Sequence, residues 1–169
     1  MKLILPPEVA KQLIDAMVQV GRREVGGILM GEYLGRETFC VTELTIQHKG
    51  GTFARFIRMV EEILAPLRAF FDATKHDYTR FNYLGEWHSH HSFALTPSKR
   101  DHRTMYDMVM DPQLGARFIV LLLVRLDNLG QLEANATVYQ PNKAPFVCTI
   151  IREGAFNSVE KTSSLDLRA

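Results

Sequence analysis

Two histidines and an aspartate stand close together in the sequence, at His88, His90 and Asp101. Side chains of an extended segment alternate between its two faces, so His88 and His90 are expected to project from the same side and to share one ion. A catalytic zinc ion commonly takes three protein ligands and leaves its fourth position to water. Asp101 is the nearest good candidate for the third ligand. The pattern therefore predicts a zinc site that still needs a general base.

The segment from Ser98 to Asp101 also fits a helix-capping pattern. A serine and an acidic residue three positions later can satisfy the unpaired amide groups at a helix start. Thr96 and Pro97 offer another N-cap and first helical residue. Taken alone, the segment favours capping over catalysis. One metal centre, however, accounts for the histidine pair, the carboxylate and the nearby hydroxyl together, so the metal-site interpretation is preferred.

The spacing of apolar side chains predicts the elements that position these residues. Alternation from Phe81 to Trp87 predicts a strand that delivers His88 at its end. Pro66 either kinks the second of three expected helices or marks its first turn. The helices are expected over about 7–21, 60–71 and 97–110. Further strands are expected over 3–5, 25–31, 39–46 with a bulge near Glu43, 52–57, 118–124, 132–139 and 146–151.

The composition limits the class of protein. Among 169 residues, 20 lysines and arginines nearly balance 19 aspartates and glutamates, so nucleic acid is not an expected partner. No apolar run approaches the ~18 residues of a membrane span, and no membrane contact is expected. Cys40 and Cys148 both lie in predicted strands, which suits reduced core thiols in a cytoplasmic protein.

Strands mixed with three helices indicate an α/β or α+β domain, with the helices packed on a curved, mixed sheet. The sequence shows no internal repeat, and its one shift in composition is a polar end. We therefore expect a single domain over residues 1–156 and a flexible tail over residues 157–169.

Two motifs resemble the JAMM family of metalloproteases, also called MPN+ or JAB. The His-Ser-His triplet at 88–90, a gap of seven residues and the Ser-x-x-Asp segment at 98–101 match that family's signature. Upstream, residues 24–31 (Glu-Val-Gly-Gly-Ile-Leu-Met-Gly) resemble its Glu-x-Gly-Gly-x-Leu-x-Gly segment. The resemblance covers nearly the whole chain. The chain is also short, which resembles the small bacterial JAB peptidases. It implies a cytidine-deaminase-like domain with a curved mixed sheet and about three helices.

The resemblance also implies a role for each motif residue. His88, His90 and Asp101 would hold Zn²⁺, and Glu24 would act as the general base that takes a proton from the attacking water. Ser98 would donate a hydrogen bond to the oxyanion of the tetrahedral intermediate. No acyl-enzyme is implied, so neither cysteine is required.

Three residues near the histidines need separate interpretation. His91 stands where the family usually has proline, and a role facing the substrate is preferred to metal binding because adjacent strand residues face opposite sides. Glu86 has two expected roles, with no preference between them. It either orients a ligand imidazole without binding the metal itself, or it forms an ion pair in the core or at the surface. Trp87 is expected to pack in the core and anchor the strand end.

The activity that the resemblance implies is that of a zinc-dependent isopeptidase or peptidase. It would cleave after the C-terminal tail of a ubiquitin-like protein, in deconjugation or precursor processing, with the tail lying along an exposed strand beside the zinc. Bacterial relatives often accompany E1-like and E2-like proteins in antiphage conjugation systems, which makes those proteins expected partners. Two alternatives stay open: trimming of a sulfur-carrier protein, and a catalytically inert scaffold.

Overall fold

The computed structural model describes residues 1–47, 60–90 and 94–152. These residues form three helices and seven strands, which confirms the expected mixed fold of helices on a curved sheet. In chain order the elements are β1 (Lys2–Leu5), α1 (Pro7–Val20), β2 (Gly26–Gly35), β3 (Thr38–Leu44), α2 (Val60–Ala73), β4 (Phe81–Ser89), α3 (Lys99–Val109), β5 (Ile119–Leu126), β6 (Leu132–Tyr139) and β7 (Phe146–Arg152). The strand expected over 52–57 and the tail expected from 157 lie outside the described residues.

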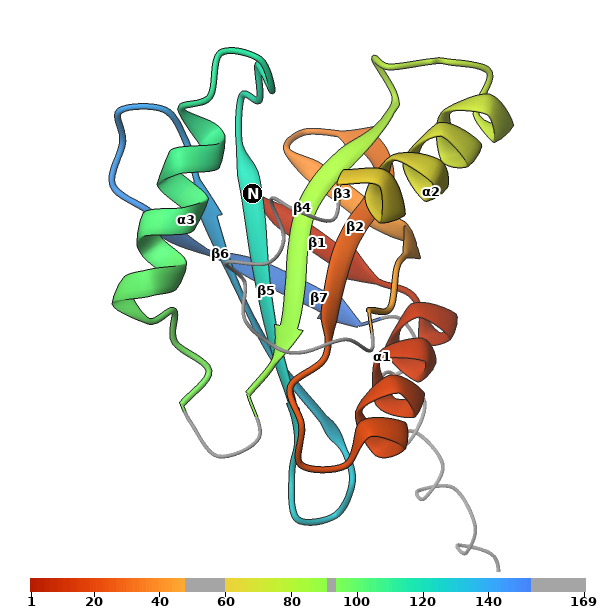
Figure 1. Ribbon diagram of the computed structural model, residues 1–169, viewed down its shortest axis with the longest axis vertical. Helices are drawn as coiled ribbons and strands as arrows, with labels where there is room; N and C mark the ends of the chain where they lie inside the picture. The colour runs from red at the N-terminus through yellow and green to blue at the C-terminus, as the bar shows by residue number, and fades with distance from the viewer. Residues whose placement is uncertain (48–59, 91–93, 153–169) are drawn as a thin grey trace, which may run out of the picture.

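The seven strands close into a barrel in the order β1, β3, β2, β4, β5, β6, β7, with β7 returning to β1. The pairs β1–β3, β1–β7 and β4–β5 are parallel and the others are antiparallel. Figure 1 shows α2 and α3 on opposite sides of the β4 region, with α1 near one end of the strands. Strand β4, which was expected to carry the histidines, is paired with β2 on one side and with β5 on the other.

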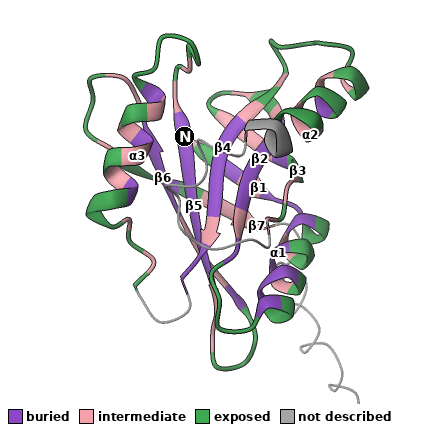
Figure 2. Cartoon of the chain, in the orientation of Figure 1, coloured by how far each residue is buried: buried purple, intermediate pink, exposed green. Residues whose placement is uncertain are grey.

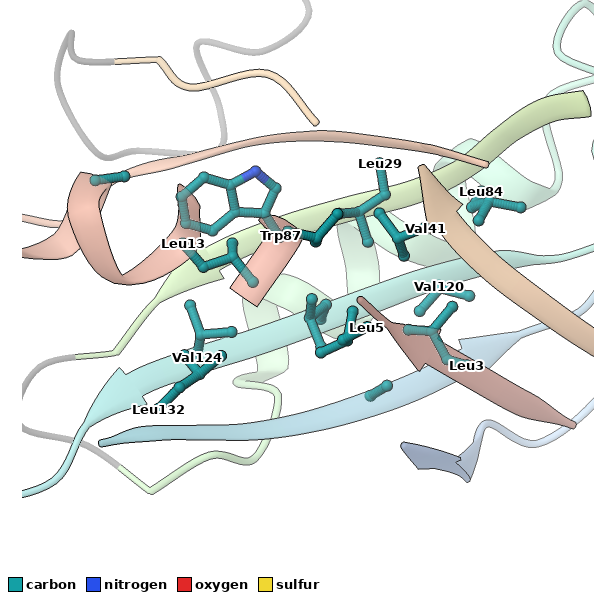
Figure 3. Close-up of a cluster of buried hydrophobic side chains, with 14 of the residues drawn as sticks. Leu3, Leu5, Leu13, Leu29, Val41, Leu84, Trp87, Val120, Val124 and Leu132 are labelled. Carbon is teal, nitrogen blue, oxygen red and sulfur yellow. The ribbon is translucent and has the colours of Figure 1, made fainter. Parts of the chain in front are cut away.

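Alternate strand positions fill the barrel interior with apolar side chains, as the period of two requires. One face of α1, which includes Leu13 and Met17, packs into this cluster. Trp87 of β4 is 1% exposed and lies beside Leu13 in the cluster (Figure 3). Full burial of one large apolar side chain contributes roughly 1.5–3 kcal/mol. The interior cluster is thus the main stabilising unit, and it confirms the expected anchoring role of Trp87.

The outer face of the sheet is shared by the other two helices. Phe70 of α2 packs on Ile28 and Met30 of β2, whereas Met105 and Val109 of α3 pack on the outward residues of β5 and β6. Figure 2 shows the resulting division of α3 into one buried and one exposed face. The two helices therefore leave the outward residues of β4 between them.

Two of the boundaries that differ from those expected have a local physical reason. Strand β2 does not end at Gly31 but continues to Gly35. Gly31 stands at a bulge, where a Cβ atom would come within 2.1 Å of the carbonyl oxygen of Cys40, so this glycine allows close strand approach and does not stop the strand. Helix α3 begins at Lys99 with Ser98 as N-cap, which excludes the cap expected at Thr96.

The structure also answers the expectations for Pro66, for the bulge near Glu43 and for the two cysteines. Pro66 lies inside α2 and is not in its first turn. The register of β2 and β3 shifts at Glu43, which confirms the expected bulge. Cys40 and Cys148 form no disulfide, and burial raises the pKa of the Cys148 thiol to about 11. Among the described helices, none combines the length and the apolar character that crossing a membrane requires.

Replacement of Gly85 should test the close contact between β4 and β5. Gly85 has a φ of 149°, and a Cβ atom there would lie 2.0 Å from the carbonyl oxygen of Val120. We expect Gly85→Ala to lower the free energy of unfolding, measured by urea denaturation, by about 3 kcal/mol, because backbone strain and a clash with backbone combine. Gly130 also has a positive φ, of 74°, but no atom lies within 4 Å of its Cβ position.

Gly130→Ala is therefore the matched control, and it should cost only about 1 kcal/mol. Equal losses in the two variants would contradict the close approach of β4 to Val120.

Candidate metal centre

The end of β4 brings the two histidine rings together on the outer face of the sheet. The Nε2 atoms of His88 and His90 lie 3.1 Å apart. The backbone amide of His90 donates to the carbonyl of Val124, 2.8 Å away, so the pairing with β5 continues one residue beyond Ser89. The alternation that predicted a shared side for the two imidazoles is confirmed.

The N-terminus of α3 brings Asp101 to the same place. The Oδ2 atom of Asp101 accepts the backbone amide of Ser98 at 2.7 Å, and the Oγ atom of Ser98 accepts the backbone amide of Asp101 at 3.1 Å. The other carboxylate oxygen, Oδ1, lies 3.7 Å from Nε2 of His88. The capping box is thus confirmed, and it also aims the carboxylate: one oxygen caps the helix and the other faces the histidines.

These three side chains fit a single metal ion. Their ligand atoms all lie within 4.8 Å of one another. Two donors that each bind zinc at about 2.0–2.1 Å in a tetrahedral arrangement stand roughly 3.3 Å apart, and the separations of 3.1 Å and 3.7 Å lie on either side of that value. Two imidazoles and a carboxylate are also ligand types that zinc accepts. The structure therefore brings His88, His90 and Asp101 together as a group that could hold a metal ion.

The protonation of both histidines suits metal binding. The ring atom Nδ1 of His90 lies 3.0 Å from the carbonyl oxygen of Ala94, which can only accept, so Nδ1 carries the proton. In a neutral ring Nε2 then holds the lone pair that a metal needs. Burial lowers the pKa of His88 to about 4. The charge of Asp101 raises this pKa and His90 lowers it, but both effects are smaller than that of burial. The lowered pKa keeps the His88 ring neutral near pH 7, the form in which an imidazole binds a metal.

Glu24 lies at the same end of the sheet, directly before β2. Its neighbour Val25 is joined to Ser89 by two hydrogen bonds: the amide of Val25 donates to the Ser89 hydroxyl at 3.0 Å, and the amide of Ser89 donates to the carbonyl of Val25 at 2.8 Å. Gly26 pairs with His88. Glu24 is exposed and directly precedes Val25, whose backbone is bonded to Ser89 between the two histidines. Glu24 therefore lies at the same end of the molecule as His88 and His90.

Glu86 fits neither of its two expected roles. It is fully buried, and neither carboxylate oxygen has a hydrogen bond or an ion pair among the described residues. Ile28 and Leu121, its partners across the sheet, are apolar and equally buried. Burial raises its pKa well above the usual glutamate value, with a smaller opposing effect from Tyr83. Burial disfavours the charged carboxylate, and neither an ion pair nor a bond to a ligand imidazole is seen for Glu86 among the described residues.

Three other residues were named in the sequence analysis: Trp87, Ser98 and His91. Trp87 points inward, and its Nε1 donates to the carbonyl of Thr45 at 2.9 Å. Ser98 is exposed, so its hydroxyl is accessible. His91 lies outside the described residues. Two further polar groups near the site were missed at the level of the sequence: Ser89, whose hydroxyl accepts the amide of Val25, and Asn135, whose Nδ2 donates to the carbonyl of Leu95. The first could have been found from its place between two same-side histidines, which turns it toward the opposite face.

Comparisons with known proteins agree with this site and fold. The family model of prokaryotic homologues of the JAB domain matches residues 6–155. The CD-NTase/cGAS isopeptidase of Enterobacter hormaechei subsp. hoffmannii (strain UCI 50) is 25% identical over 146 residues, which cover 85% of this chain and 78% of that protein. The solution structure of protein DSY2949 from Desulfitobacterium hafniense has a TM-score of 0.62 at 15% identity, over 89% of this chain and 92% of that one, and supports the fold. The chain therefore belongs to the family of prokaryotic homologues of the JAB domain.

Proposed function

We propose that this protein is a zinc-dependent isopeptidase that cleaves the bond between the C-terminus of a ubiquitin-like protein and an amino group. The observation that carries the proposal is the convergence of the ligand atoms of His88, His90 and Asp101 at the sheet end where Glu24 stands. The similarity to a CD-NTase/cGAS isopeptidase supports an isopeptide bond as the target. Zn²⁺ held by the three ligands would supply a water molecule that is reactive at neutral pH.

Two residues of the chain would carry the proton and charge transfers. Glu24 acts as the general base: its carboxylate takes a proton from the attacking water and passes it to the departing amine. The Ser98 oxygen already accepts the amide of Asp101, which leaves the hydroxyl hydrogen to donate to the oxyanion. Cysteine chemistry is not needed, because direct attack by water forms no acyl-enzyme; burial also raises the pKa of the Cys148 thiol to about 11.

The substrate is a ubiquitin-like protein with an extended C-terminal tail, or a conjugate of such a protein. Strand β4 is paired on one side with β2 and on the other with β5. The strand that carries the histidines therefore offers no edge to the tail within the described residues, and the tail would pair with another element. Glycines at the tail end would let its backbone approach the proposed metal ligands closely.

The similarity to a CD-NTase/cGAS isopeptidase and the family resemblance together support a proposal for the biological setting. We place the activity in the cytoplasm, in a bacterial antiphage conjugation system with E1-like and E2-like partners. Trimming of a sulfur-carrier protein would use the same residues on a different bond. The inert scaffold is disfavoured, because all three ligand side chains converge. Parallel assays on a lysine-linked conjugate, a linear fusion and an extended sulfur carrier would rank the three substrate types.

Glu24→Gln should separate the reaction from metal binding. It removes the basic oxygen and keeps the size of the side chain, so kcat on a lysine-linked ubiquitin-like conjugate should fall about 10²–10⁴-fold. The zinc content and the free energy of unfolding should not change. Glu43→Gln, at an exposed glutamate of β3, is the control and should keep full activity. Full activity of the Glu24 variant would remove Glu24 as the base.

Asp101→Asn should test the carboxylate as a metal ligand while sparing the helix cap. The amide oxygen can still accept the backbone amide of Ser98, so α3 should keep its N-terminus. Loss of the negative charge that faces His88 should abolish stoichiometric zinc, measured by elemental analysis after dialysis. If the variant kept one zinc ion per chain, another side chain, with His91 the first to test, would be the third ligand.

Ser98→Ala should distinguish capping from catalysis. Loss of the cap alone should lower the free energy of unfolding by about 1 kcal/mol. Loss of an oxyanion donor should in addition lower kcat by about 10²–10³-fold at saturating substrate. Ser98→Asn is the control, because it keeps a capping side chain. Should the alanine variant lose stability and keep kcat, Ser98 would be a cap only.

A further inference from the structure

We propose that strand β6, which carries no metal ligand, aligns two of the three ligands through Asn135 and Tyr139. Asn135 holds the segment whose carbonyl orients His90, and Tyr139 holds the helical turn that carries Asp101. This inference rests on the proposed metal site and adds two positioning residues to it. Neither residue needs to touch the substrate.

Asn135 and Tyr139 are polar residues of a layer that is apolar apart from them and Thr137. Residues 135, 137 and 139 alternate with inward residues of β6 and pair with Leu123, Leu121 and Ile119 of β5. Those three β5 side chains belong to the cluster under α3, and so does Tyr139, which is fully buried. A polar group in such a layer costs free energy unless it is hydrogen-bonded. Both Asn135 and Tyr139 are bonded, and each bond leads to a ligand.

Asn135 acts on His90 through two neighbouring carbonyl groups. Its Nδ2 donates to the carbonyl oxygen of Leu95 at 2.7 Å. The side chain of Leu95 packs against the cluster under α3, so this residue is fixed at two points. The preceding carbonyl, of Ala94, accepts the Nδ1 proton of His90 at 3.0 Å. Asn135 therefore fixes the acceptor that keeps the Nε2 lone pair of His90 directed at the metal position.

Tyr139 acts on Asp101 through the first turn of α3. Its hydroxyl lies 2.9 Å from Nδ1 of His102, the residue next to Asp101. Its ring meets Tyr106, one turn further along the helix, edge to face at a centroid distance of 5.4 Å. Burial and, second, the charge of Asp101 raise the pKa of Tyr139, so the hydroxyl stays neutral beside the carboxylate. These contacts fix the rotation of α3 that turns one Asp101 oxygen to His88.

Apolar packing alone would not give this alignment. Met105 and Val109 hold α3 on the sheet, but contacts between apolar side chains have no preferred direction. Metal sites need their ligands within about 0.5 Å of the correct position. The hydrogen bonds of Asn135 and Tyr139 supply the direction, so their loss should loosen the metal site more than the fold.

The test compares zinc affinity with stability in three isosteric variants. Asn135→Leu and Tyr139→Phe each remove one polar group of β6 and keep its volume. Thr137→Val, at the buried position between them, is the matched control, because it removes a hydroxyl that has no hydrogen bond within the described part of the chain. Zinc dissociation constants are measured by competition with a zinc-chelating dye, and unfolding free energies by urea denaturation of the metal-free proteins.

We expect the zinc dissociation constant to rise about 10–100-fold in Asn135→Leu and in Tyr139→Phe, and to stay at the wild-type value in Thr137→Val. In the metal-free protein, ¹⁵N chemical shifts should show the Nδ1–H form of His90 in the wild type and a mixture of both neutral forms in Asn135→Leu. If Asn135→Leu does not fold, Asn135→Ala takes its place in both measurements.

The inference would be overturned if Asn135→Leu and Tyr139→Phe both kept the wild-type zinc affinity. It would also be overturned if they lost no more zinc affinity than Thr137→Val. A wild-type protein that binds no stoichiometric zinc would instead overturn the proposed function. The ¹⁵N measurement, made without metal, would still decide whether Asn135 fixes the ring of His90. The two failures are therefore distinguishable.

Discussion

The antiparallel pairing of β2 with β4 is the constraint on which the site depends. It joins Val25 to Ser89, 64 positions apart in the chain, through a hydrogen bond to the serine hydroxyl and one between backbones. Without this pairing, Glu24 would have no fixed relation to His88 and His90. The serine between the histidines thus serves the site from the opposite face of the strand, by holding the turn that carries the proposed base.

The two faces of β4 divide stability from chemistry. The inward face carries Trp87, which is locked by packing and by its bond to the carbonyl of Thr45. The outward face carries His88, with Glu86 behind it in a wholly apolar row. Because the period of a strand is two, one strand can be anchored inside the barrel and still present ligands outside. Glu86 is the exception: it is a buried carboxyl in that row, and Tyr83 is the polar side chain among the described residues that acts on its pKa.

Much of this arrangement could be predicted from local rules. The shared side of His88 and His90 needs only strand alternation, and Ser98 with Asp101 needs only capping chemistry. The sequence could not show that one oxygen of the Asp101 carboxylate caps the helix while the other faces His88. Nor could it show Asn135, because that residue acts on Leu95, 40 positions away. Contacts of this kind depend on how the barrel closes, which spacing along the chain does not encode.

One ion in one place is the central claim. Crystals of the zinc-loaded protein, measured on both sides of the zinc absorption edge, would locate the metal by anomalous scattering. The account predicts a single strong peak within bonding distance of Nε2 of His88, Nε2 of His90 and Oδ1 of Asp101, with Glu24 facing it. A peak elsewhere, or one that leaves Asp101 out of contact, would contradict the account.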